Sequence, residues 1–310
     1  TAIETLASSR AEERSVKRQL DQAEKRLEVG LAPITDVHEA RARYDTARAN
    51  AIAAATALED SREALAEITG QPLDGLMGLA PGYKPENTDT RTAEEWVSIA
   101  AESNPSLKAA ELGLAAAERD IGTARSAHLP SLSASASIGD SAGWQNQYPG
   151  GPNTSGGGST VGISLSVPLY AGGAVQSGVR QAVHGRDIAA DQLEQARRSV
   201  IRQTRNAQRS LGAGSAEVEA RRLSVVSAQA AYEASEAGLE VGTRTIVDVL
   251  ITQQSLFQAQ REYARARHDF LVNTLRLKQA AGTIALADLQ EVNRVLVQDA
   301  EAALDESLSQ

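Results

Sequence analysis

The chain has 310 residues, of which 42% are hydrophobic and only 3% aromatic, so it holds little of the bulky material from which a thick globular core is built. A formal net charge of −9 opposes binding to a nucleic-acid backbone, and without cysteine the chain can form neither a disulfide nor a thiolate metal site. This composition disfavours compact enzymes and nucleic-acid-binding proteins, whereas the many small and helix-forming residues suit close-packed helix pairs.

The first element expected is a helical hairpin. From Leu6 onward, apolar or small residues recur at alternating steps of three and four, which is the pattern of a coiled-coil seam. Gly30 fits the position after a helix end, where a positive φ is needed. We therefore expect one helix before this turn and a returning helix up to about Gly70. The seam of the returning helix comprises Val37, Ala40, Tyr44, Ala47, Ala51, Ala54, Leu58, Ser61, Leu65 and Ile68.

A linker and two short helices are expected next. Residues 70–90 are rich in Gly and Pro, which is typical of a linker. Thr92 and Glu95 then fit a capping box that opens a short helix. The Asn-Pro pair that follows is predicted to end this helix and to start another, which runs to about Ala127.

Two strands are predicted where the periodicity changes to two. Apolar side chains alternate with Ser or Gly in residues 129–139 and again in residues 161–170, so each segment has one apolar face. Each is about as long as the roughly 9 to 11 residues that a tilted strand needs to cross a bilayer, and a membrane barrel therefore suits both segments. A soluble hairpin with one buried face is the alternative. Two strands cannot close a barrel, so the membrane interpretation requires oligomerisation, further strands or both.

A second helical hairpin is expected because the first one recurs. Residues 239–282 match residues 27–70 without a gap, Leu-Glu-Val-Gly opens both copies, and duplication is a better account of the match than chance. The helix before the second turn is expected to run from about Ala174 to about Val241. From the helices alone, a spectrin-like or other antiparallel coiled-coil rod is an equal alternative.

No catalytic, cofactor or metal site is expected. The four histidines form no close helical pair and have no cysteine companions, which argues against a metal site. The sequence has no Gly-x-Ser-x-Gly elbow and no Gly-x-x-x-x-Gly-Lys phosphate loop. We therefore predict that the protein is not an enzyme.

Four segments together resemble the TolC family of bacterial outer-membrane efflux channels. RLEVGLAPITDVHEARARYD and GLEVGTRTIVDVL resemble the two helical-hairpin tips, and HLPSLSASAS and VGISLSVPLYAGG resemble a β-hairpin of the family. The resemblance implies a mainly α fold with a β-hairpin. Long antiparallel coiled-coil hairpins would form an α-barrel tunnel, and transmembrane strands would join a β-barrel shared by three subunits. The family's first helices and first β-hairpin would precede Thr1.

The resemblance also implies a function and its partners. The protein would be the exit duct of a tripartite efflux pump or type I secretion system, passively exporting drugs, small molecules or proteins. It would lie in the bacterial outer membrane, in contact with outer-membrane lipid, and extend into the periplasm. A periplasmic adaptor protein and an inner-membrane pump of RND, ABC or MFS type would complete the exporter, with no nucleic-acid partner. A soluble coiled-coil scaffold is the alternative function.

Three sets of site residues follow from the resemblance. Asp248 would face the lumen at the pore constriction, although an acidic residue there also suits simple stabilisation of a helix N-terminus. The family's type member has a second acidic residue where this chain has Ile251, and a tyrosine where it has Leu239, so a single acidic ring and fewer bonds at the tip are expected. The gate links that hold the tip closed would be Thr35, Asp36, Arg244 and Arg267, and the adaptor-binding tips would be Val29, Gly30, Leu31, Val241, Gly242 and Thr243.

Five segments are expected along the chain. They are a first-repeat periplasmic hairpin, truncated at its N-terminal end, over residues 1–70; a linker with short equatorial helices over 71–127; an outer-membrane β-hairpin with an exposed loop over 128–171; a second-repeat long hairpin over 172–282; and a C-terminal equatorial segment over 283–310.

Overall fold

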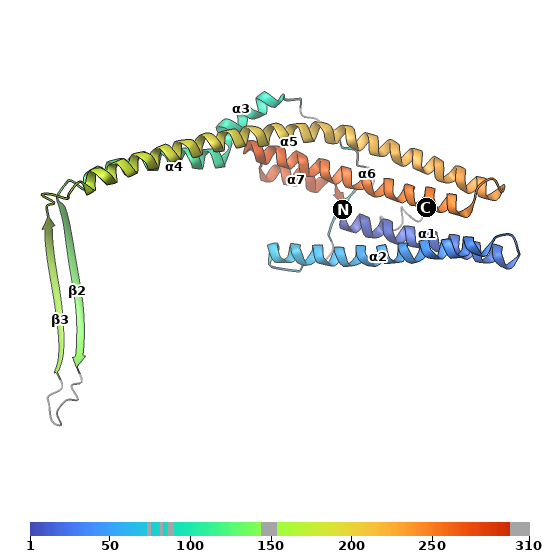
Figure 1. The fold of residues 1–310 in the computed structure, drawn as a ribbon, viewed down its shortest axis with the longest axis horizontal. Coiled ribbons are helices and arrows are strands. Elements are labelled where there is room, and N and C mark those ends of the chain that lie inside the picture. The colour runs from blue at the N-terminus through green and yellow to red at the C-terminus, as the bar shows by residue number, and fades with distance from the viewer. Residues whose placement is uncertain (73–75, 81–82, 86–89, 144–153, 298–310) are drawn as a thin grey trace, which may run out of the picture. The chain divides into compact units, whose positions relative to one another are not determined.

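The computed structural model describes residues 1–72, 76–80, 83–85, 90–143 and 154–297. Its contacts divide the chain into two compact units, Thr1–Asn104 with Val200–Gln310, and Pro105–Ser199. The first unit holds both helical turns of the repeat, and the second holds the two long strands (Figure 1). The mainly helical fold with one long β-hairpin confirms the predicted fold class.

The first hairpin consists of α1 (Ala2–Glu28) and α2 (Ile34–Thr69), which run antiparallel and side by side (Figure 1). Small residues line the contact, and Ala23 and Ala40 are fully buried there, which allows the two backbones to approach closely. Near the start of α1, Leu6 packs against Leu58 of α2. Ile68, at the end of the predicted seam, is exposed because α2 runs on past that contact.

The second hairpin consists of α5 (Ala174–Glu240) and α6 (Ile246–Ala281), which confirms the long helix predicted before the second turn. From Val200 onward, α5 packs against α6 through a cluster of buried apolar residues. Phe270 lies at its centre and is one of only two Phe in the chain. The members of the cluster are Trp96, Ala100, Val200, Leu211, Val218, Ala266, Phe270, Leu277 and Ala281.

Short elements close the other end of the second hairpin. The predicted capping box of Thr92 and Glu95 opens α3 (Ala93–Ser103), and α6 ends at Gly282 with φ of 73°. A Cβ atom at Gly282 would lie 2.5 Å from the carbonyl oxygen of Ser103, so only glycine fits there. Beyond it, α7 (Leu286–Arg294) leads to β4 (Leu296–Val297), which pairs antiparallel with β1 (Gly78–Leu79).

The second unit carries α4 (Pro105–Ser126), the start of α5 and the antiparallel pair β2 (Ser131–Gly143) and β3 (Thr154–Ser166). The predicted alternation is confirmed, because the register places Ala134 opposite Ile163 and Ala136 opposite Val161 on one face. The exposed loop was expected over residues 140–160, but residues 140–143 and 154–160 belong to the paired strands, and β3 ends at Ser166 rather than near Tyr170. The rest of the expected loop, residues 144–153, lies outside the described residues.

None of the helices in the described part of the chain is long and apolar enough to span a membrane.

Candidate functional site

The two helical turns have the same backbone geometry. In the first turn Gly30 has φ of 75°, and the amide of Leu31 donates to the carbonyl of Arg26 at 2.8 Å. In the second turn Gly242 has φ of 77°, and the amide of Thr243 donates to the carbonyl of Gly238 at 2.8 Å. These hydrogen bonds close each helix end in the manner of a Schellman motif, so both glycines take the left-handed conformation predicted for them.

The tips of both turns expose apolar side chains. Val29, Leu31 and Val241 are 68%, 77% and 75% exposed, although each lies directly beside a left-handed glycine. The turns therefore present apolar surface to any partner that reaches them.

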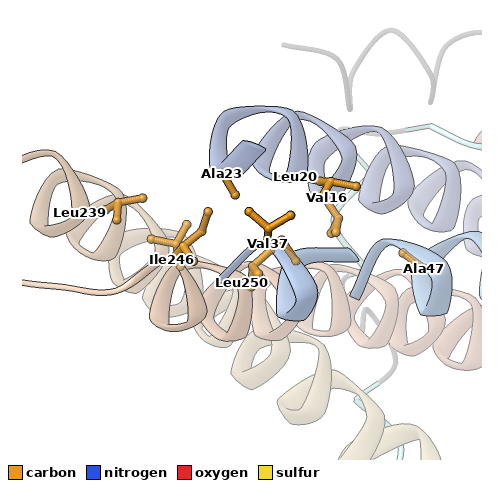
Figure 2. Close-up of a cluster of buried hydrophobic side chains, with 10 residues drawn as sticks. Val16, Leu20, Ala23, Val37, Ala47, Leu239, Ile246 and Leu250 are labelled. Atoms are coloured by element: carbon orange, nitrogen blue, oxygen red, sulfur yellow. The ribbon is translucent and has the colours of Figure 1, made fainter. Parts of the chain in front are cut away.

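Beneath the tips, the two hairpins share one apolar cluster. Figure 2 shows Ala23 of α1, Val37 of α2 and Leu250 of α6 pointing toward one another, and Leu239 and Ile246 flank the second turn. All five residues are buried. Because α1, α2, α5 and α6 all contribute to this cluster, it fixes the two turns relative to each other.

Asp248 is held by its own helix. It is the third residue of α6, and one oxygen of its carboxylate accepts hydrogen bonds from the amide and the hydroxyl of Thr245, both at 2.9 Å. The amide of Asp248 donates back to the same hydroxyl at 3.2 Å, which completes a capping box. The backbone hydrogen bond from Thr245 and the hydroxyl bond hold the pKa of Asp248 below its usual range, with a smaller contribution from the charge of Arg244.

Asp36 occupies the matching position of the first repeat but has no such cap. The N-cap of α2 is Pro33, which has neither an amide hydrogen nor a hydroxyl to offer the carboxylate. The hydroxyl of Thr35 lies 3.5 Å from one carboxylate oxygen, the outer limit of a hydrogen bond. Asp36 is therefore free to turn toward other groups.

A cavity of about 210 Å³ between the two turns brings Asp36 and Arg244 together. Arg26 also lines it, so two arginines and one aspartate surround a small space. Within the described ranges, no hydrogen bond or ion pair joins Arg244 to Thr35 or Asp36. Asp36 and Arg244 are thus neighbours in this structure without being bonded to each other. The cavity is lined by Ala23, Arg26, Leu31, Ala32, Asp36, Leu239, Gly242, Arg244, Thr245 and Ile246.

Arg267, expected among the gate links, does not lie at the tip. It is in the sixth turn of α6, about 30 Å along the helix from Ile246 at roughly 1.5 Å per residue. There it is buried and forms an ion pair with Glu4 of α1 at 3.3 Å, while Nε2 of His268 lies 2.6 Å from the other carboxylate oxygen. Arg267 joins neighbouring helices, but at a site separate from Arg244.

Farther from the turns than the apolar cluster, the contact between α1 and α6 is polar, and the periodicity of the sequence did not predict this. In addition to the pair at Glu4, Arg261 forms an ion pair with Glu12 at 2.7 Å, and the amide of Gln253 donates to the hydroxyl of Ser15 at 2.7 Å. Burial raises the pKa of Glu4, but the hydrogen bond and charge of His268, with smaller contributions that include Arg267, bring it below its ordinary value. The buried polar residues of α1 recur at helical spacing, and this was the available signal: Glu4, Ser8, Ser9, Glu12, Ser15 and Gln19.

Within the ranges that the structure describes, no group of three or more His, Asp or Glu residues could hold a metal ion.

Comparison with known proteins gives one consistent result. The model of the family described as "Outer membrane efflux protein" matches residues 1–71 and 96–283. Outer membrane protein TolC of Vibrio cholerae serotype O1 is 39% identical over 94% of this chain and 67% of its own length. Outer membrane protein TolC of Escherichia coli K12 is 38% identical over 95% of this chain. The chain spans 61% of that relative's length.

The fold has also been seen in solved structures. A membrane protein from Pseudomonas aeruginosa superposes with a TM-score of 0.70 over 91% of this chain and 65% of its own, at 23% sequence identity. At this identity the likeness concerns the fold alone.

Proposed function

Because the chain belongs to the outer membrane efflux protein family, we propose that it forms part of a trimeric outer-membrane channel, the exit duct of a tripartite efflux pump or type I secretion system. In this assembly the strands join a barrel in the outer membrane, and the two hairpins line a tunnel in the periplasm. Transport is passive, since the duct opens and closes but performs no chemical step. Drugs, small molecules or proteins are the classes of cargo that such a duct takes.

The observation that carries this proposal is the exposed apolar face of the β-hairpin. Ile138 is 92% and Val161 82% exposed, and both belong to the faces that alternate with Ser and Gly. Left in water, this apolar face would invite association with other proteins. In a membrane barrel the apolar face of the hairpin contacts lipid and the Ser and Gly face contacts water, so the barrel accounts for both faces. A soluble coiled-coil scaffold has no use for such a pair of strands.

The turns are the proposed docking sites for the periplasmic adaptor. Their exposed apolar residues and left-handed glycines give each tip a compact surface that a second helical hairpin can contact. An inner-membrane pump of RND, ABC or MFS type then acts through the adaptor. The proposed contact residues are Val29, Gly30 and Leu31 of the first turn, and Val241, Gly242 and Thr243 of the second.

The gate is proposed to lie at the same end of the hairpins. Asp248 lines the constriction, and three copies around the axis concentrate negative potential there. Arg244 holds the inner hairpin by pairing with Thr35 or Asp36, from its own chain or from a neighbour. The shared cavity supports this pairing, because Arg244 and Asp36 both reach it while Asp36 has no cap to hold it. Arg267 joins α6 to α1 in the proposed wall of the tunnel and takes no part in the gate at the tip.

The test uses the full-length protein that contains this sequence, purified in detergent and reconstituted in planar bilayers. We expect a trimer, and we expect Asp248→Asn to weaken cation selectivity and block by multivalent cations, because the ring loses its charge. The effect should be larger at low salt, where the Debye length reaches about 30 Å at 0.01 M. Ile251→Asn, one turn further along α6, is the control and should leave block unchanged.

Two results would contradict the proposal. A monomer that remains stable in water without detergent would favour the scaffold. Unchanged selectivity in the Asp248→Asn trimer would remove Asp248 from the pore lining.

A further inference from the structure

The side chain of Arg244 lies against the last turn of α5 at the place where Gly238 has no side chain. A Cβ atom at Gly238 would lie 2.6 Å from Cγ of Arg244 and 3.2 Å from its Cβ. Both atoms belong to the base of the arginine side chain, close to the backbone. They cannot swing aside as the end of a flexible chain can, so a larger residue at position 238 would displace the arginine.

The turn itself does not require glycine at this position. The carbonyl of Gly238 accepts hydrogen bonds from the amides of Thr243 and Arg244 at 2.8 and 3.1 Å. The carbonyl of Arg26 accepts the matching bond from Leu31, also at 2.8 Å, and Arg26 is the residue that corresponds to Gly238 in the first repeat. The same backbone position therefore carries a full arginine side chain in the other copy.

The two repeats place an arginine and a small residue on opposite sides of the turn. In the first repeat Arg26 precedes the turn and Ala32 follows it, whereas in the second Gly238 precedes the turn and Arg244 follows it. In both copies an arginine on one side accompanies a small residue on the other. Each turn in this way sends one arginine to the cavity that Asp36 lines.

We infer that Gly238 is a positioning residue for Arg244: it leaves the space in which the base of the arginine rests and so determines where the guanidinium lies. The inference rests on the proposed function, in which Arg244 holds the tip closed. In the described part of the chain the guanidinium makes no hydrogen bond or ion pair. Packing against Gly238 thus restrains the side chain before any partner binds it.

Planar-bilayer recordings of the full-length trimer test this role. We expect Gly238→Ala to raise the conductance of the closed channel by the same factor as Arg244→Ser, because both remove the guanidinium from its place. Gly212→Ala is the matched control, since it lies in the same helix and a Cβ there meets nothing within 4 Å. Alanine is the better helix former at both positions, so helix propensity predicts no loss for either variant.

The double variant separates displacement of Arg244 from any other effect. Arg244→Ser replaces Cγ and the guanidinium by a small hydroxyl that can rotate away. The contacts that remain, to Cβ of residue 244 at 3.2 Å and to Oγ1 of Thr243 at 3.3 Å, need only small shifts, so Gly238→Ala should add little to the effect of Arg244→Ser. If Gly238→Ala blocks trimer assembly, Arg244→Ser should restore assembly, and a failure to do so would overturn the inference.

Three outcomes of the recordings would also contradict it. Wild-type conductance in Gly238→Ala beside a raised conductance in Arg244→Ser would overturn the positioning role alone. Additive increases in the double variant would mean that Gly238 acts independently of Arg244. Unchanged conductance in Arg244→Ser would overturn the gate itself, together with this inference.

Discussion

At the scale of single residues, duplication has placed an aspartate at the same position of each repeat, but the two aspartates have different surroundings. Asp248 accepts two hydrogen bonds from Thr245, whereas Asp36 follows Pro33, which can donate none. The carboxylate of Asp248 is therefore held by the cap of its own helix, whereas that of Asp36 has no cap to hold it. A fixed charge suits a selectivity ring, and a movable one suits a bond that breaks when a gate opens.

We predict that Thr245→Val raises the pKa of Asp248. The variant removes the hydroxyl that donates to the carboxylate and leaves the backbone amide in place. In the wild type the lowered pKa keeps the ring charged as the pH falls, and any stability that this charge contributes is lost only as the pH drops through the lowered value. In the variant, block by multivalent cations should disappear at a higher pH, which a pH series of bilayer recordings will measure.

Thr92→Val is the control for this experiment, because Thr92 forms the same capping box with Glu95 at the start of α3. It weakens a helix start without touching the tip and should leave the pH dependence of block unaltered. Equal shifts in both variants would show that the effect comes from loss of a helix cap in general. Thr245→Ser, which retains the hydroxyl, should behave as the wild type.

Much at this scale could be predicted from the sequence. Glycine after a helix end predicted the left-handed conformation of Gly30 and Gly242, and Thr92 with Glu95 predicted the cap of α3. Thr245 and Asp248 have similar spacing and could have been recognised in the same way. The contact of Gly238 with Arg244 could not, because it depends on the path of the chain through the turn.

At the scale of helices, the hairpins contain two kinds of contact. Within each hairpin the seam is apolar, whereas α1 meets α6 through apolar side chains near the turns and through ion pairs and hydrogen bonds farther from them. Every buried residue of α2 lies on the seam predicted by the steps of three and four, although Ser61 and Ile68, toward the end of that seam, are exposed. The same steps could not predict the polar contact, because periodicity shows which face of a helix is covered and not what covers it.

We predict that Arg267→Leu destabilises the protein by roughly 3 kcal/mol, since removing one partner of a buried pair leaves the other charge inside without compensation. Glu4 keeps its contact with His268, which holds the loss near the lower end of the usual range. Urea unfolding of the full-length protein in detergent measures the change. Replacing both Glu4 and Arg267 by leucine should cost less than replacing Arg267 alone.

Arg265→Leu is the control for this loss. Arg265 lies two residues away, is exposed and pairs with Asp269 at 3.6 Å, so its removal should cost less than about 1 kcal/mol. Equal costs for the two arginines would show that the buried pair contributes no more than a surface one.

At the scale of the whole molecule, one chain supplies only part of the proposed barrel. The alternation of residues 129–139 and 161–170 predicted two paired strands and their faces, which the structure confirms, but the strands extend into the expected loop and β3 ends earlier than predicted, at Ser166. Neither the closure of a barrel nor the number of subunits is encoded in one hairpin. Those features depend on contacts between copies of the chain, so they are inferred from the family and remain proposals.

We predict that Val161→Arg prevents insertion into the outer membrane. Val161 lies near the middle of β3 on the apolar face, where an arginine in contact with lipid costs about 2–4 kcal/mol at the bilayer midplane. Thr160→Arg, the adjacent residue on the polar face, should still insert and change only conductance. Membrane fractionation and recovery of trimers distinguish the two, and equal recovery would contradict the assignment of the faces.

The polar contact between α1 and α6 also bears on the order in which the protein folds. α1 and α2 are adjacent in the chain and can pair early, but the partner of Ser15 is Gln253, which is made 238 residues later. Until α6 has been synthesised, the side of α1 that will contact it presents Glu4, Glu12 and Ser15 to water. Had this face been apolar, the half-made protein would have carried a surface prone to aggregation throughout synthesis. These polar residues of α1 therefore keep the first hairpin soluble until the second hairpin has been synthesised.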